Sequence, residues 1–453
     1  KTTLAHQVAF HAASEDENVL VFTGFSEPHD KLVAHMRGFE FFHLKQIGTR
    51  IQFANLLDLL QAGMAETEEA ILSTVRRHGA TLVIFDGFQG MRRRLMDEPT
   101  PGQFLYSLGS KLALFGATTV VAMEGDIDAP SSYPELTVAD VILALRRDLT
   151  SPHHRRTLDV IKARGSAPLA GSHPYTITAT GITVYPRFES IVSHHEPSNI
   201  DRRLMCGIPD IDTLVGGGLT AGTMTLIAGS PGTGKTLLGL HLLIEGARRG
   251  ERGLFLGFME SPEQLRHQAR TFGLEIDDAE ARDLVRLCVL PAYDLEPDMV
   301  AALLRDEIET GEVQRLVIDS VSELERATAM QGRSMAYMSA LVAYLRGRDI
   351  TSYETMDIQA IVGPDLTLTD TPISVMAENL VLLRQVEYAG ELRRLFSVLK
   401  VRFSEFDRTI HEYTIHAERG IEMIGPAPLA LGLLTGIAQP IPDADSRLGR
   451  NRK

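Results

Sequence analysis

The chain has 453 residues and 44% hydrophobic content, enough apolar material for two cores, and this length is typical of two or three domains. Its 45 basic and 59 acidic side chains give a formal net charge of −14, which argues against a nonspecific nucleic-acid coat and an anionic membrane surface. The two cysteines, Cys206 and Cys288, cannot supply a disulfide framework, and no apolar run reaches the roughly 18 residues of a membrane span, so we expect a cytoplasmic protein.

The first residues of the chain match the end of a phosphate-binding loop. Lys1 and Thr2 correspond to the pair that closes the pattern G-x-x-x-x-G-K-[ST], but no loop glycines precede them. We therefore expect an N-terminal truncation that removes the first strand and the loop glycines of the first domain. Lys1 and Thr2 are its candidate nucleotide contacts, and Thr2 is also a candidate Mg²⁺ ligand.

Charged side chains follow three strand-like runs of this first half. Glu27 follows a buried strand, where its carboxylate would polarise an attacking water; the alternative is an acid that complements a helix dipole. Asp86 ends the apolar run at 82–85, a position from which it would orient Mg²⁺ through water. Lys162 and Arg164 place two cations on one face of a later strand, because side chains alternate with period two.

A complete phosphate-binding loop lies at the middle of the chain, where residues 229–236 read Gly-Ser-Pro-Gly-Thr-Gly-Lys-Thr. An apolar run precedes it and a helical pattern follows it, which is the strand–loop–helix context that the motif needs. Backbone N–H groups would wrap the β-phosphate, Lys235 would reach the β- and γ-phosphates, and Thr236 would ligate Mg²⁺. The predicted ATP contacts are Gly229, Ser230, Pro231, Gly232, Thr233, Gly234, Lys235, Thr236 and Leu237.

Strands and helices alternate through the second half, which predicts a mostly parallel sheet covered on both faces. Ser261 and Gln264 have the spacing of a capping box at a helix start. The expected strands are 224–228, 253–257, 285–289, 316–319, 380–383 and 395–401, and the expected helices are 237–248, 262–272 and 297–310.

The landmarks of the first half recur in the second half in the same order. Lys235 follows Lys1 at an offset of 234 (235 − 1), and Asp319 follows Asp86 at 233 (319 − 86). An offset this constant predicts a duplicated α/β domain, too long to be a solenoid repeat. We place the first domain at 1–187, a polar linker at 188–206, the second domain at 207–425 and a mobile tail at 426–453.

The second half repeats the candidate catalytic residues. Glu260 and Asp319 occupy the positions of Glu27 and Asp86, so the same roles as base and Mg²⁺ ligand are expected. Lys400 and Arg402 repeat the cation pair. Since nothing within one domain explains that recurrence, we expect the pair to reach the γ-phosphate held by a neighbouring subunit, as a trans-acting arginine finger does.

The full set of motifs resembles tandem KaiC-type domains of the RecA superfamily. The resemblance rests on 207–212 and 216–219 before the complete loop, on 258–262 and on 372–380, and in the first half on 162–166 and 174–177. It implies two tandem RecA-like P-loop domains, ATP bound between subunits, a two-tiered homohexameric ring, slow ATP hydrolysis, and autophosphorylation in the second domain. Some members of this family belong to circadian clocks.

The chain also departs from the family pattern. Ser26 and Met259 replace the first of two consecutive glutamates, which weakens hydrolysis and phosphotransfer if that glutamate is the base. The adjacent Ser-Thr phosphoacceptors of the family correspond to Ser374 and Val375, so Ser374 is the one candidate acceptor that the resemblance implies.

These observations predict a KaiC-like, slowly hydrolysing ATPase that signals to other proteins as a ring, with possible serine autokinase activity. One alternative is a non-hydrolysing ATP-dependent scaffold, which the missing glutamates favour. The other is a DNA recombinase or helicase motor, which would need basic central loops. The basic triplet 92–94 has an acidic counterpart at 322–325, so DNA is not an expected partner.

Overall fold

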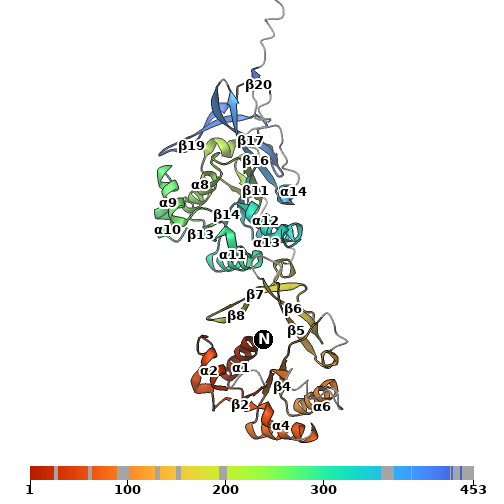
Figure 1. The fold of residues 1–453 in the computed structure, drawn as a ribbon. Coiled ribbons are helices and arrows are strands. Elements are labelled where there is room, and N and C mark those ends of the chain that lie inside the picture. Colours follow the sequence, from red (N-terminus) through yellow and green to blue (C-terminus); the bar gives the residue numbers. More distant parts are fainter. Residues whose placement is uncertain are drawn as a thin grey trace, which may run out of the picture. The chain divides into compact units, whose positions relative to one another are not determined.

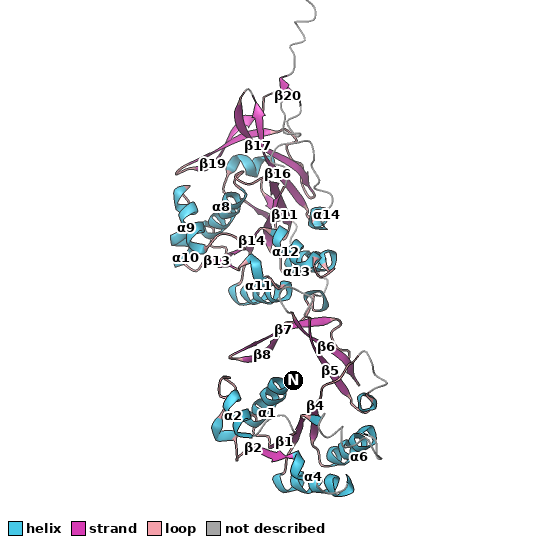
Figure 2. Cartoon of the chain, viewed as in Figure 1, coloured by secondary structure: helices cyan, strands magenta, loops and turns pink. Residues whose placement is uncertain are grey.

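Parallel strands joined by helices make up most of each half of the chain in the computed structural model (Figures 1 and 2). The structure describes residues 1–24, 29–59, 64–88, 101–127, 133–148, 155–192, 201–358, 372–388, 390–428, 430–431 and 439–440. The chain divides into unit 1, Lys1–Ser190, and unit 2, Ile191–Lys453.

One mixed sheet organises unit 2, with the strand order β13-β12-β14-β15-β11-β16-β17-β18-β19. The strands from β13 to β16 are parallel, and β16 to β19 are antiparallel. The strands are β9 (Arg203–Leu204), β10 (Leu219–Thr220), β11 (Met224–Gly229), β12 (Gly253–Gly257), β13 (Val285–Val289), β14 (Arg315–Asp319), β15 (Thr351–Asp357), β16 (Asn379–Tyr388), β17 (Glu391–Val401), β18 (His411–His416), β19 (Gly420–Pro426), β20 (Ala430–Leu431) and β21 (Gln439–Pro440).

Helices cover both faces of this sheet (Figure 1). They are α7 (Pro209–Leu214), α8 (Lys235–Arg248), α9 (Pro262–Thr271), α10 (Ile276–Ala281), α11 (Pro297–Gly311), α12 (Val321–Ala329), α13 (Ser334–Gly347) and α14 (Pro372–Met376). Because both faces are covered, the central strands β11 and β12 are buried along their whole length. Helix α9 begins at the predicted capping box. The Ser261 hydroxyl accepts a hydrogen bond from the backbone N–H of Gln264, and the Gln264 side-chain oxygen accepts one from the backbone N–H of Ser261.

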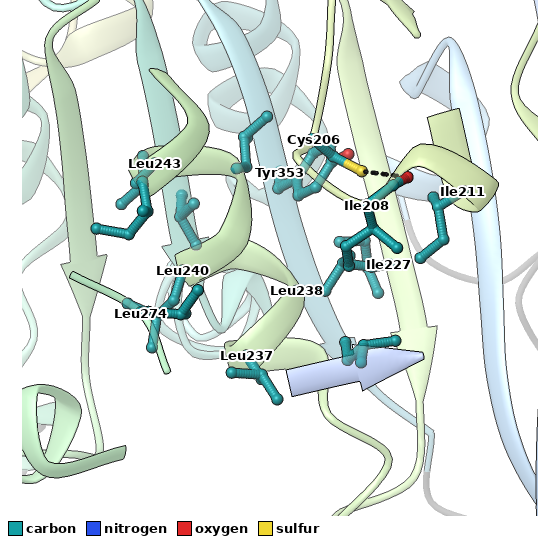
Figure 3. Packing of buried hydrophobic residues seen from close by; sticks show 14 of the residues in the cluster. Cys206, Ile208, Ile211, Ile227, Leu237, Leu238, Leu240, Leu243, Leu274 and Tyr353 are labelled. Carbon is teal, nitrogen blue, oxygen red and sulfur yellow. Dashed lines mark hydrogen bonds between the residues drawn. The ribbon is translucent and has the colours of Figure 1, made fainter. Parts of the chain in front are cut away.

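Helix α8, which follows the phosphate-binding loop, is the centre of one hydrophobic core. Its side chains Leu237, Leu238, Leu240 and Leu243 are almost fully buried and pack with Ile227, Tyr353 and Leu274 (Figure 3). A helix that is apolar on so much of its surface is fixed by packing rather than by its propensity. The end of α8 that carries Lys235 is thereby held at the sheet edge.

Unit 1 repeats this strand order in two sheets, β2-β1-β3-β4 and β5-β6-β7-β8. These match the strands on the two sides of β11, and among the described strands of unit 1 none takes the position of β11. The elements are α1 (Thr2–Ser14), β1 (Val19–Thr23), α2 (His29–Met36), β2 (Ile51–Asn55), α3 (Leu56–Leu59), α4 (Met64–His78), β3 (Leu82–Asp86), α6 (Pro101–Leu114), β4 (Thr118–Ala122), β5 (Val141–Arg147), β6 (Arg156–Ala163), β7 (Ser172–Thr178) and β8 (Gly181–Val184).

The expected strands and helices of the second half are present, with β16 and β17 longer than expected. Polar residues such as Gln385 and Arg394 interrupt the apolar runs from which the strands were predicted. The two strands nevertheless pair from Asn379 opposite Val401 to Tyr388 opposite Glu391. At the expected linker, Phe188 is fully buried and unit 1 extends to Ser190. Within the expected tail, β20 pairs with β21, and 441–453 lie outside the described residues.

Candidate functional site

The complete loop connects β11 to α8 with a backbone that glycine alone adopts without strain. Gly232 and Gly234 have φ of 78° and 91°, in the left-handed region. A Cβ on Gly229 would lie 2.6 Å from the Leu383 carbonyl oxygen. Thr233 closes the loop, since its Oγ1 donates to the Ser230 carbonyl at 2.8 Å and its own carbonyl accepts from Tyr413 at 2.5 Å. The loop therefore presents the N-terminus of α8 in a fixed geometry suited to an anion.

Lys235, the first residue of α8, is folded back into the loop. Its Nζ donates to the carbonyls of Gly229 and Ser230 at 2.9 and 3.1 Å, and it lies 2.9 Å from Oδ1 of Asp357. The Lys235 side chain is 8% exposed, whereas that of Asp357 is 54% exposed. The ammonium group is therefore buried against one half-exposed carboxylate at the end of β15.

Thr236 and Asp319 meet beside this lysine. Thr236 Oγ1 donates to Asp319 Oδ2 at 2.7 Å, and the fully buried Thr355 donates to Oδ1 of the same carboxylate. Asp319 ends β14, which lies next to β15 in the sheet. A hydroxyl and a carboxylate side by side at a helix N-terminus are the oxygen ligands that Mg²⁺ takes beside a phosphate.

Glu260 follows β12 at the same edge of the sheet. Burial raises the pKa of its carboxyl group, and the charge of Asp319 raises this pKa further. Glu260 Oε2 is buried without a hydrogen-bond partner, whereas the neighbouring Met259 is 77% exposed. A carboxylate with a raised pKa and an open acceptor oxygen can accept a proton from a water molecule.

Unit 1 brings the counterparts of these residues together. Thr2 Oγ1 donates to Asp86 Oδ1 at 3.2 Å, and Lys1 Nζ lies 2.7 Å from Oε1 of Glu124. His6 Nδ1 lies 3.9 Å from Oδ2 of Asp86, and burial lowers the pKa of His6. The candidate base Glu27 lies outside the described residues, as does the triplet at 92–94.

The cation pairs differ from the prediction in two ways. Strands β6 and β17 end at Ala163 and Val401, so Arg164 and Arg402 lie beyond them and the pairs do not share one strand face. A register shift also interrupts each strand just before its lysine: Ile142 pairs with Lys162 and Leu380 with Lys400, but the next pairs skip one residue. A bulge at this place shifts the face of the lysine relative to the earlier part of the strand, although it leaves the lysine and the arginine two residues apart.

The expectation that nothing within one domain explains these cations is wrong for Arg164, which has an acidic partner, whereas both lysines contact backbone carbonyls of their own unit. Lys162 donates to the Thr137 carbonyl at 3.1 Å, and Lys400 donates to the Ala377 carbonyl at 2.6 Å. Arg164 pairs with Asp140 at 3.3 Å. Burial lowers the pKa of Lys400, the charge of Arg402 lowers it further, and Glu378 opposes both effects. Arg402 is exposed.

Ser374 lies half-buried in the short helix α14, before strand β16. Residues 359–371, which precede it, lie outside the described residues. Its role as phosphoacceptor stays a prediction.

Sequence reasoning missed Asp357, Thr355 and Glu124, although all three contact predicted site residues. Glu124 and Asp357 stand at the offset that separates Asp86 from Asp319 (357 − 124 = 233). The repeat offset was therefore the signal that could have identified Glu124 and Asp357.

Similarity to known proteins extends over most of this chain. The family model for the KaiC ATPase matches residues 1–189 and 204–427. The circadian clock oscillator protein KaiC of Picosynechococcus is 28% identical over 435 residues, which cover 92% of this chain and 82% of that protein. The circadian clock protein KaiC3 of Synechocystis is 29% identical over 473 residues, 99% of this chain and 90% of that protein. The KaiC of Nostoc is 26% identical over 438 residues, covering 92% and 82%.

Proposed function

Because this chain belongs to the KaiC family of ATPases, we propose that unit 2 binds MgATP at the loop between β11 and α8 and hydrolyses it slowly. The observation that carries the proposal is the convergence of Lys235, Thr236 and Asp319, with Thr236 Oγ1 2.7 Å from the Asp319 carboxylate. Lys235 would turn from its loop carbonyls to the β- and γ-phosphates, and the N–H groups at the start of α8 would hold the β-phosphate.

Thr236 and Asp319 would hold the Mg²⁺ ion. Among the described residues, no three His, Cys, Asp or Glu side chains are grouped as a self-sufficient metal site. This fits an ion whose remaining ligands are phosphate oxygens and water, as Mg²⁺ prefers. Thr355 would keep Asp319 in place through its hydrogen bond to Oδ1.

Glu260 would act as the general base in this reaction. Its unpartnered oxygen supports that role, and Met259 beside it has no acidic group to share the task. One carboxylate stands where the family pattern has two consecutive glutamates, and this is the reason that we propose slow hydrolysis.

We further propose that the protein acts as a ring-forming ATPase that signals to other proteins; the clock-protein names of its relatives support the signalling role. Exposed Arg402 is the cation that remains available to a neighbouring subunit. The DNA-motor alternative is weakened by the acidic side chains Glu323 and Glu325 on α12, which follows the Asp319 strand.

Among the residues described, no helix combines the length and apolar character needed to cross a bilayer.

Phosphate release from ATP tests the proposal. Wild-type protein should release phosphate slowly with Mg²⁺ and not with a chelator, and Lys235→Ala should lower the rate at least about 100-fold. Asp278→Asn, which removes a charge from the exposed Arg282 pair on α10, is the matched control and should keep the wild-type rate. Equal rates in wild type and Lys235→Ala would contradict the proposal, whereas ATP binding without turnover would support the scaffold alternative.

A further inference from the structure

Asp357 lies beside the phosphate-binding loop and contacts the lysine of that loop. It is the last residue of β15 and pairs across the sheet with Gly229, the first residue of the phosphate-binding loop. Its Oδ1 lies 2.9 Å from Lys235 Nζ, whose other two contacts are the carbonyls of Gly229 and Ser230. These three acceptors use all three N–H groups of the ammonium. The loop lysine is therefore fully satisfied by acceptors within the protein.

The arrangement recurs in unit 1, which argues that it is not an accident of one side chain. Lys1 Nζ lies 2.7 Å from Glu124 Oε1, two residues past the end of β4. Strand β4 pairs with the Asp86 strand as β15 pairs with the Asp319 strand. Each unit thus has a carboxylate against this lysine at the equivalent position of the repeat, although Asp357 lies within its strand and Glu124 just past its strand.

Binding of a nucleotide changes the balance at Asp357. Lys235 has to leave its internal acceptors to reach the β- and γ-phosphates. The Asp357 carboxylate then stays, without its cation, close to the place where the γ-phosphate adds negative charge, and like charges repel. A diphosphate carries no γ-phosphate, so the repulsion falls mainly on the triphosphate.

We propose that Asp357 is a specificity-determining residue that weakens the binding of nucleoside triphosphate relative to diphosphate. The inference rests on the proposed function of the loop and adds a regulation to it. The product diphosphate is retained, and exchange for triphosphate is disfavoured until the charge of Asp357 is neutralised. Asp357 contacts Lys235 and does not need to take part in the chemical step.

Calorimetric titration with MgADP and with the non-hydrolysable MgAMP-PNP tests this proposal on the full chain. Asp357→Asn should tighten AMP-PNP binding about tenfold while it changes ADP binding less than about twofold. Asp357→Glu keeps the charge and should keep the wild-type ratio, as should the control Asp278→Asn. Asp357→Ser supplies a second neutral variant if the asparagine variant folds poorly.

The outcomes separate this inference from the proposed function. If both nucleotides bind and Asp357→Asn or Asp357→Ser leaves their affinity ratio unchanged, the inference is overturned while the proposed function stands. The proposed function and the inference are overturned together if wild-type protein binds neither nucleotide. They are also overturned together if the Lys235→Ala variant binds both nucleotides as tightly as wild-type protein does.

Discussion

At the scale of single residues, the protonation of Glu260 should set the pH range of ATP turnover. A general base acts in its deprotonated form, so the rate should fall as the pH drops through the pKa of Glu260. Burial and the charge of Asp319 raise that pKa above 4.5, its ordinary value, so the acid limb of the pH profile should lie above pH 4.5. Glu260→Gln should lower the rate about 100-fold or more and remove this limb.

Initial rates of phosphate release across the acid range check this prediction. Glu263 lies exposed in the first turn of α9, so Glu263→Gln removes the same type of charge and serves as the control. An unchanged acid limb in Glu260→Gln would assign the base to another group.

The residues of the site also show how far the sequence alone could lead. The loop and Asp319 were predictable because spacing along the chain and one apolar run define them. No local pattern predicts Asp357 or Thr355, because β15 reads Thr-Ser-Tyr-Glu-Thr-Met-Asp, a polar sequence that is nonetheless buried from Thr351 to Met356, and only the repeat offset could have indicated Asp357. The position of β15 between β14 and β11 depends on the strand order, which no local pattern contains. Arg164 and Arg402 were placed on strands wrongly because β6 and β17 end one residue before them, at Ala163 and Val401, and no local pattern marks that end.

At the scale of elements, β15 carries a buried acid that makes the stability of unit 2 depend on pH. Glu354 is fully buried, both of its carboxyl oxygens lack a hydrogen-bond partner, and burial raises its pKa from 4.5 to about 8. Below pH 4.5 the group is protonated in the folded and unfolded states alike. Between pH 4.5 and about 8 the folded state holds a proton that the unfolded state has lost, so the free energy of unfolding falls as the pH rises.

Urea unfolding of wild type and Glu354→Gln at pH about 5.5 and about 8.5 tests this prediction. The glutamine variant does not titrate, so it should gain stability over wild type by a few kcal/mol more at the higher pH than at the lower. Glu387→Gln on the exposed side of β16 is the control and should give no such difference. A difference between the variant and wild type that is the same at both pH values would show that Glu354 titrates normally.

At the scale of the whole molecule, the duplication extends beyond the fold to individual contacts. Both units join a threonine to the strand-end aspartate, the first lysine to a carboxylate at the end of the strand that follows this aspartate, and the lysine after the bulge to a backbone carbonyl. In unit 1 the arginine after the bulge is held by Asp140, whereas the equivalent acid of unit 2, Glu378, binds Arg346 and the Met224 amide. Among the described contacts, Asp140 therefore pairs with Arg164 in unit 1, whereas the equivalent Glu378 of unit 2 pairs with Arg346 and not with Arg402.

This difference predicts that unit 2 contributes the intersubunit cation of the proposed ring. Arg402→Ala should weaken MgATP-dependent assembly and lower turnover, because its guanidinium would neutralise phosphate charge across the subunit boundary. Arg164→Ala should have a smaller effect on assembly, since Asp140 already pairs with that guanidinium. Arg408→Ala removes an exposed arginine that lies over the Phe406 ring in the same loop and serves as the control.

Multi-angle light scattering with and without MgATP measures the assembly. A wild-type protein of unchanged mass in saturating MgATP would contradict the ring, and equal assembly by wild type and Arg402→Ala would remove Arg402 from the interface.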